Sequence, residues 1–201
     1  MLIFVHGFNT DFDVAVFRLA QIAHDSCTTV APVLFSWASR GSLFGYEYDK
    51  DSATLARDEL EKVIDEAAAS PDVRDITILA HSMGAWLAME SLRQSAIRNG
   101  RVPEKLHNVI LASADLDIDV FRNEFSALGP ARPQVTLFVS RDDRALRLSR
   151  LISGDSARLG AVDPSVEPNR SKLEALGIAV YDLTALKAQD PLAHTKFASS
   201  P

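Results

Sequence analysis

The stretch ITILAHSMGA, residues 76–85, decides the fold. Residues 76–80 form a short, continuously apolar run, which is typical of a strand buried on both faces. Residues 83–97 follow as a stretch that is apolar on nearly all sides, which indicates a helix packed centrally against a sheet. Only His81 and Ser82 separate the two, so the chain has no room for a loop. The sequence therefore predicts a strand, a sharp turn at the serine and a buried helix.

Two small residues flank Ser82 at the spacing that such a turn needs. Ala80 and Gly84 stand two positions before and after it, and Ala80 replaces the more usual glycine with a methyl group that still fits. The turn would present the serine hydroxyl at the carboxyl edge of the sheet and direct the positive end of the helix at whatever the serine attacks. The Met83 amide is then expected to be one donor of an oxyanion hole. A serine that merely caps a helix is the alternative.

Outward from this segment, apolar runs alternate with amphipathic stretches, a pattern that favours a parallel sheet with helical crossovers. The expected strands are residues 2–5, 30–35, 76–80, 109–112, 135–139 and 178–181. Helical spacing of apolar residues recurs at 12–27, 56–67 and 83–97. We expect an α/β fold with a mostly parallel central sheet of about six strands flanked by helices on both faces. Residues 1–201 are expected to form a single domain, compact and lidless because the link between the fourth and fifth strands is short.

Composition agrees with a globular protein and narrows its partners. The chain has 201 residues, 47% of them hydrophobic and 24% charged, enough to bury a substantial core. A net charge of −6 argues against nucleic acid or an anionic membrane as the main partner, and no stretch is long and apolar enough to span a bilayer. Cys27 is the only cysteine, which excludes an internal disulfide and a multi-cysteine zinc site. A small-molecule substrate and no metal or other cofactor are expected.

The first strand gives information about the cellular location of the protein and about the second donor of the oxyanion hole. Met1 runs straight into it without a basic segment or cleavage site, which favours the cytoplasm; a trimmed chain that has lost an export signal is the alternative. The strand ends in His6-Gly7-Phe8. Hydrolases with a strand–serine–helix turn place their other oxyanion amide at this position, which here is the N–H of Phe8. His6 precedes the serine in the chain and is expected to stabilise the turn.

The base must follow the serine and the acid in the chain order Ser, Asp or Glu, His. Only His107 and His194 follow Ser82. His107 adjoins the start of the fourth strand, at the edge opposite the site, so a structural role is expected. His194 comes after the last strand in a loop that can reach the serine. An exposed terminal histidine is the alternative interpretation.

Three aspartates compete for the role of the acid, which holds the imidazole tautomer and stabilises imidazolium. Asp142 and Asp143 follow the fifth strand directly, and Asp115 follows the fourth. Asp115, Asp117 and Asp119 also resemble the start of a calcium loop, but its required glycine and glutamate are missing. Solvated capping of the next helix explains that trio better.

Aromatic residues between 36 and 49 are expected to wall the substrate pocket. We assign substrate binding to Trp37, Phe44 and Tyr46. The alternative is that these side chains pack onto the domain without contacting a ligand.

Several motifs in order carry a family resemblance: 5–10 (VHGFNT), 35–41 (FSWASRG), 80–84 (AHSMG), 115–117 (DLD), 140–146 (SRDDRAL) with Ser149, and 194–197 (HTKF). The chain resembles the bacterial α/β-hydrolases grouped as domain of unknown function nine hundred, over essentially its full length. The resemblance implies a serine esterase or lipase-like hydrolase without a metal, with Asp143 as the acid, three residues after Ser140. Asp142 would then face solvent. Ala38 departs from the family's usual proline, and the family's C-terminal helix after the histidine is missing.

These features together predict cleavage of carboxylic esters through an acyl-enzyme, with a triad of Ser82, His194 and Asp143 and an oxyanion hole from the Phe8 and Met83 amides. A thioesterase, an amidase or an acyltransferase could use the same triad. A non-catalytic binding module on this fold is a less favoured alternative, because binding alone does not need all three residues.

Overall fold

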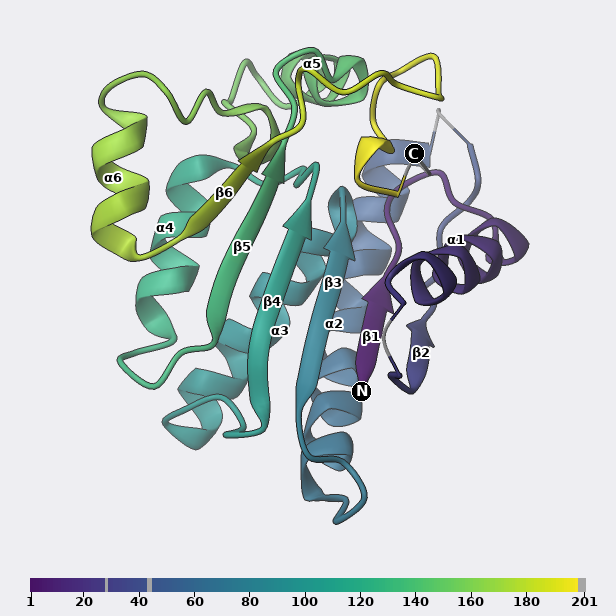
Figure 1. Ribbon diagram of the computed structural model, residues 1–201, viewed down its shortest axis with the longest axis vertical. Coiled ribbons are helices and arrows are strands. Elements are labelled where there is room, and N and C mark those ends of the chain that lie inside the picture. Colours follow the sequence, from purple (N-terminus) through teal and green to yellow (C-terminus); the bar gives the residue numbers. More distant parts are fainter. Residues whose placement is uncertain (28, 43–44, 199–201) are drawn as a thin grey trace.

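The centre of the molecule is a parallel sheet (Figure 1). The computed structural model describes residues 1–27, 29–42 and 45–198, and within them six strands pair in the order β2-β1-β3-β4-β5-β6. Every neighbouring pair is parallel. The strands are β1 (Leu2–Val5), β2 (Pro32–Phe35), β3 (Ile76–His81), β4 (Leu106–Ala112), β5 (Gln134–Val139) and β6 (Ala179–Asp182). Each predicted strand is confirmed, with small shifts at its ends.

Helices connect the strands, as the alternation predicts. They are α1 (Phe12–Asp25), α2 (Tyr46–Ala69), α3 (Met83–Asn99), α4 (Ile118–Ala127), α5 (Arg144–Ile152) and α6 (Asn169–Leu176), with short 3₁₀ turns at Leu159–Ala161 and Lys196–Ala198. Helix α2 begins well before the apolar spacing at 56–67 suggests, because its first turns carry the charged residues Glu47, Asp49 and Lys50. The link between β4 and β5 contains α4, which packs against α3.

The strand order explains which helix covers which face. The chain leaves β1 toward β2 in one direction and then returns past β1 to β3, and right-handed crossovers in opposite directions place their helices on opposite faces. Helices α2, α3 and α4 therefore lie together behind the sheet, whereas α1 lies in front of β1 and β2 (Figure 1). The α/β class and the helices on both faces agree with the prediction.

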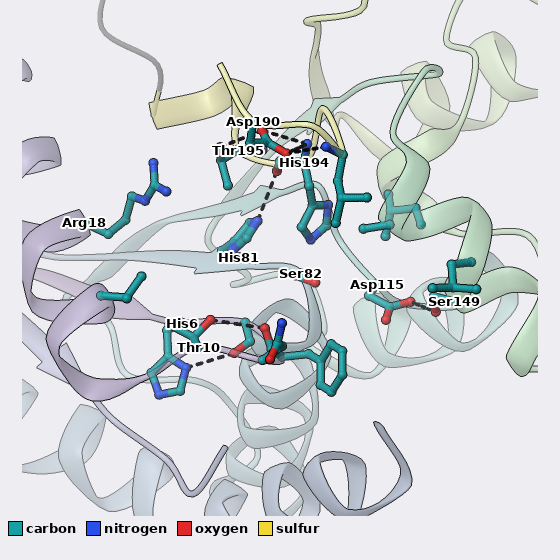
Figure 2. Close-up of a pocket in the computed structure, with 18 of the residues that line it drawn as sticks. His6, Thr10, Arg18, His81, Ser82, Asp115, Ser149, Asp190, His194 and Thr195 are labelled. Carbon is teal, nitrogen blue, oxygen red and sulfur yellow. Dashed lines mark hydrogen bonds between the residues drawn. The ribbon is translucent and has the colours of Figure 1, made fainter. Parts of the chain in front are cut away.

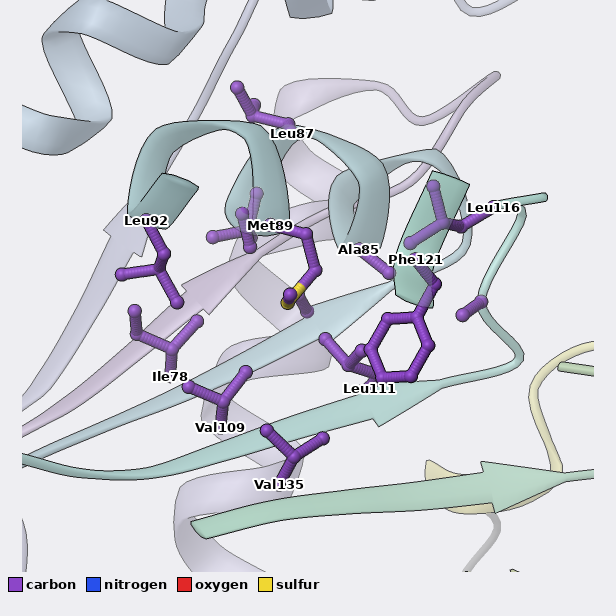
Figure 3. Packing of buried hydrophobic residues seen from close by; sticks show 14 of the residues in the cluster. Ile78, Ala85, Leu87, Met89, Leu92, Val109, Leu111, Leu116, Phe121 and Val135 are labelled. Carbon is purple, nitrogen blue, oxygen red and sulfur yellow. The ribbon is translucent and has the colours of Figure 1, made fainter. Parts of the chain in front are cut away.

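The main core lies between the sheet and the rear helices. Figure 3 shows Met89 and Leu92 of α3 facing Ile78 and Val109 of the sheet, all fully buried. Phe121 of α4 extends the same core beside β4. Such burial is the dominant stabilising contribution to folding.

The front face is less completely covered. Leu19 of α1 packs there with Phe4 and Leu79. Farther along the sheet, Thr77, Asn108 and Thr136 are only partly buried. These central strands are thus less continuously apolar than strands buried on both faces.

Candidate active site

A topological switch point lies between β1 and β3, where crossovers diverge to the two faces. In open parallel sheets such a point leaves a crevice beyond the carboxyl ends of the strands, and ligands bind there. Here a cavity of about 240 Å³ opens at this point (Figure 2). Its lining includes the last residue of β3 (His81) and residues that follow β1 (His6, Gly7, Phe8), β3 (Ser82) and the last strand (Asp190, Leu192, His194, Thr195).

Ser82 occupies the turn between β3 and α3 in a strained backbone conformation. Its φ is 55° and its ψ is −123°, a combination that residues with a side chain rarely adopt. The main chain holds it there: its N–H donates to the Ala112 carbonyl at 3.0 Å, and its carbonyl accepts from the Asp115 N–H at 3.1 Å. Figure 2 shows the serine hydroxyl in the middle of the site.

The small residues around the turn are required by close backbone approach. A methyl group on Gly84 would lie 2.4 Å from the carbonyl oxygen of His6, and one on Gly7 would lie 2.8 Å from Cβ of Ser82. Ala80 is completely buried. The start of α3 therefore lies directly against the end of β1, which brings Phe8 and Ser82 to the same cavity.

Asp143 and His194 form a close pair beside the cavity. Nδ1 of His194 and Oδ2 of Asp143 are 2.7 Å apart, and the Asp143 side chain is 0% exposed. The other carboxylate oxygen accepts from the Leu146 N–H at 3.0 Å and so caps α5. The structure thus brings Asp143 to His194, and His194 and Ser82 to one cavity.

Asp142 does not simply face solvent, as the sequence suggested. Its carboxylate accepts from the Lys196 ammonium at 2.8 and 2.9 Å and from the Ser140 hydroxyl at 2.6 Å. Burial opposes ionisation, but these hydrogen bonds keep the pKa of Asp142 lowered. The Lys196 side chain is only 1% exposed, so it cannot stay charged without such a partner. Asp142 therefore fastens the segment after His194 to the end of β5.

Asp115 is also not a solvated cap. It is buried, accepts from the Ser149 hydroxyl at 2.5 Å and from the Tyr46 hydroxyl at 3.1 Å, and lies 3.3 Å from Nε of Arg158. Only Asp117 of the acidic trio caps α4, through the N–H groups of residues 119 and 120. Asp115 is thus paired and hydrogen-bonded on the cavity wall next to α5.

Two residues that the sequence analysis did not single out hold the His194 loop. Asp190 accepts from the N–H groups of Leu192, His194 and Thr195 and from the Thr195 hydroxyl. Burial works against ionisation, but these donors lower the pKa of Asp190 to about 2. An Asp-Pro pair four residues before the histidine is the local turn signal that could have revealed it.

His81 is the second support. Its Nε2 lies 3.2 Å from the His194 carbonyl oxygen, and its ring packs against those of His194 and Phe197. Burial, followed by the nearby His194 ring, places the pKa of His81 well below the usual value. A neutral His81, at the end of β3, therefore donates one hydrogen bond to the His194 carbonyl of the loop.

The three residues assigned to substrate binding have different positions. Tyr46 lines the cavity. Trp37 is buried outside the described cavity lining; its indole N–H donates to the His6 carbonyl at 2.9 Å and its ring stacks on the His6 ring. Trp37 thus packs under the turn that follows β1. Phe44 lies outside the described residues.

His6 stabilises this turn, as expected. Its Nε2 accepts from the Trp37 N–H at 3.2 Å, and its Nδ1 lies 2.9 Å from the Gly7 carbonyl oxygen. Burial lowers the pKa of His6, although these backbone hydrogen bonds oppose the shift.

The described part of the chain contains no group of three or more His, Cys, Asp and Glu side chains that could hold a metal ion. Among the same residues, no helix is long and apolar enough to cross a membrane.

A parallel sheet with a topological switch point next to a strand–serine–helix turn defines the α/β-hydrolase class. The chain belongs to the family of alpha/beta hydrolases of unknown function (DUF900), whose model matches residues 1–201. The predicted fold and the family resemblance are thereby confirmed. Among solved structures, a lipase-esterase related protein from Clostridium acetobutylicum ATCC 824 is similar at 12% identity and a TM-score of 0.47, over 90% of this chain and 84% of that chain. A comparison with curated proteins finds no match.

Proposed function

We propose that this hydrolase cleaves carboxylic esters with Ser82 as the nucleophile, His194 as the general base and Asp143 as the residue that orients His194. The observation that carries the proposal is the 2.7 Å contact between Nδ1 of His194 and the buried Asp143 carboxylate, in a cavity that Ser82 also lines.

The Asp143 contact determines what the imidazole can do. With its Nδ1–H donating to Asp143, neutral His194 keeps the lone pair of Nε2 for the serine proton. Ser82 then attacks the ester carbonyl carbon, and the carbonyl π electrons move to oxygen. His194 takes the serine proton during this attack. The resulting imidazolium then donates the proton to the alcohol oxygen as the bond between that oxygen and the carbonyl carbon breaks. Water repeats the sequence on the acyl-enzyme and releases the acid.

The N–H groups of Phe8 and Met83 are the proposed oxyanion donors. Neither has a hydrogen-bond acceptor among residues 1–27, 29–42 and 45–198, and Phe8 lines the cavity. Met83 is the first residue of α3, where main-chain N–H groups lack intrahelical partners and the helix dipole favours negative charge. These donors would act on the charge that develops in the transition state.

The cavity wall supports an ester with an apolar part. Side chains from four segments supply it, among them Phe4, Val14, Leu146, Leu148, Ile152 and Leu192. Such a wall gains free energy by covering hydrocarbon, and the few polar groups between these side chains fix its orientation.

The test combines active-site labelling with turnover. We expect a fluorophosphonate probe to label Ser82 and chromogenic esters of increasing acyl length to be hydrolysed. Ser82→Ala should abolish both, and Ser91→Ala, which changes a buried serine of α3 outside the described cavity lining, should abolish neither. EDTA should leave turnover unchanged. Labelling at another serine, or turnover that survives Ser82→Ala, would refute the proposal.

A further inference from the structure

Arg18 is a charged residue in the cavity that the proposed chemistry does not use. It lies on α1 and lines the same cavity as Ser82. Figure 2 shows its side chain on one side of Ser82, with Asp115 and Ser149 on the other. A ligand that extends along the cavity from Ser82 toward α1 would therefore meet a guanidinium.

Within the described ranges, this guanidinium has no hydrogen-bond acceptor or ion-pair partner. The carboxylate with the largest electrostatic influence on it is that of Asp190. Both oxygens of Asp190 already accept hydrogen bonds from its own loop. Burial lowers the pKa of Arg18, and Asp190 opposes that shift. A guanidinium nevertheless remains charged at neutral pH.

The carboxylates in the cavity already have hydrogen-bond partners within the protein. Asp115 is paired with Arg158 and hydrogen-bonded by Tyr46 and Ser149. The oxygens of Asp190 are occupied by hydrogen bonds from the loop that it holds, although its negative charge still acts on Arg18. The α1 side of the cavity is thus left with a guanidinium whose five N–H donors have no acceptor among the described residues.

We propose that Arg18 is a specificity-determining residue that binds an anionic group, of the carboxylate class, carried by the ester substrate. This inference rests on the proposed function, because it assigns a substrate class to the same cavity. Guanidinium matches the planar carboxylate through two parallel hydrogen bonds. The anion can belong to the acyl part or to the alcohol part of the ester, and these two sources require separate probes.

The experiment compares matched pairs of esters that differ only in charge. The acyl pair is phenyl hydrogen glutarate and phenyl 4-carbamoylbutanoate; the alcohol pair is 3-carboxyphenyl butyrate and 3-carbamoylphenyl butyrate. In one pair we expect the wild type to favour the anionic member in kcat/KM by about tenfold or more, the range of a charge-assisted hydrogen bond. The pair that shows the preference identifies the part of the ester that carries the anion.

Three variants test whether Arg18 causes the preference. Arg18→Gln should bring the anionic-to-neutral ratio close to one, and Arg18→Lys should retain part of it. The control is Arg150→Gln, which removes an exposed cation of α5 that pairs with Asp155 and lies outside the cavity lining. It should keep the wild-type ratio. A ratio near one for both pairs in the wild type, or a preference that survives Arg18→Gln, overturns the inference.

Binding to catalytically silent protein separates this inference from the proposed function. Ser82→Ala protein is titrated with the four esters by calorimetry, and Ser82→Ala/Arg18→Gln protein serves as its control. Anion preference in binding without Ser82-dependent hydrolysis would refute the esterase proposal and keep the Arg18 assignment. Hydrolysis of both members of each pair at equal rates would refute the Arg18 assignment and keep the esterase proposal.

Discussion

The Ser82 turn and the His194 loop meet in one cavity but are held by different forces. The turn lies between β3 and α3, and main-chain hydrogen bonds and tightly packed apolar residues fix it. The loop, residues 190–198, depends on polar side chains that come from distant parts of the chain. The apolar packing around the turn stays intact after most single substitutions of polar residues. Each polar contact of the loop, in contrast, is lost when one donor or acceptor is removed. Substitutions of polar residues should therefore impair the loop more readily than the turn.

The largest expected effect comes from Asp143, the proposed acid of the triad. Asp143→Asn removes the carboxylate that stabilises imidazolium and allows the wrong tautomer, so kcat should fall on the order of 10³- to 10⁴-fold. The Ser82 turn should remain folded. Steady-state kinetics together with near-ultraviolet circular dichroism check this. Equal activity of Asp143→Asn and wild type would remove Asp143 from the proposed triad.

Asp190 should have the next largest effect, through position alone. Asp190→Ala leaves three loop N–H groups without their acceptor, so His194 loses its fixed position and kcat should fall about 10- to 100-fold. Asp190→Asn keeps an accepting oxygen and should retain more activity than Asp190→Ala. Asp155→Asn, a surface control, should match the wild type. If Asp190→Ala is as active as the wild type, the loop does not depend on this carboxylate.

The His194 loop and helix α4, which packs against α3, should also respond oppositely to pH. The pKa of Asp190 is about 2 when folded, against a usual value of 3.8, so its contribution is complete above pH 4 and lost as the pH falls toward 2. Burial, with Glu90 nearby, raises the pKa of Glu124 on α4 to about 9. The unfolded chain releases that proton near pH 4.5 and the folded chain does not, so this group costs stability increasingly as the pH rises from 4.5 to 9.

Glu124→Gln tests this on helix α4. The substitution removes the ionisation that burial opposes, so urea denaturation should show the variant about 1–3 kcal/mol more stable than wild type near pH 8. The difference should vanish near pH 4.5. Glu104→Gln, at an exposed position, is the control. Parallel stability–pH curves for wild type and Glu124→Gln would refute the assignment.

The smallest expected effect on turnover is at Asp142. Asp142→Asn still offers an oxygen to Lys196, which also donates to the carbonyls of Leu183 and Thr184. We expect kcat to stay within a few-fold of wild type, whereas the free energy of unfolding should fall by about 1–3 kcal/mol, because the buried Lys196 ammonium keeps its hydrogen bonds but loses its counter-charge. A loss as large as that of Asp143→Asn would exchange the roles of the two neighbours.

The sequence could predict the Ser82 turn and the sheet, but not the residues that hold the His194 loop. The turn is local: an apolar run, a serine and a buried helix adjoin in the chain, so periodicity and residue size suffice to predict it. The sheet followed from the same alternation. The choice of Asp143 over Asp142 and Asp115 came from the family resemblance, because three aspartates after strand ends look alike in sequence.

The supports of the loop could not be predicted in this way. His81 contacts a residue 113 positions away, and Lys196 pairs with an aspartate 54 positions earlier. The position of Trp37 could not be predicted for a related reason: an aromatic residue in a loop looks the same in sequence whether it faces a ligand or packs under a turn. Arg18 looked like any charged residue on the exposed side of an amphipathic helix.

The double role of Asp143 has a consequence for protein engineering. One of its oxygens starts α5 and the other holds His194, and α5 supplies Leu146, Leu148, Ser149 and Ile152 to the cavity wall. The shape of the cavity and the orientation of the His194 ring therefore depend on the same carboxylate. Redesign that moves the α5 backbone to admit a bulkier ester would also turn the imidazole, so wider substrate scope would come with slower turnover. Selections for new substrates should succeed sooner through side-chain truncation at Leu148 or Ile152, which leaves that carboxylate in place.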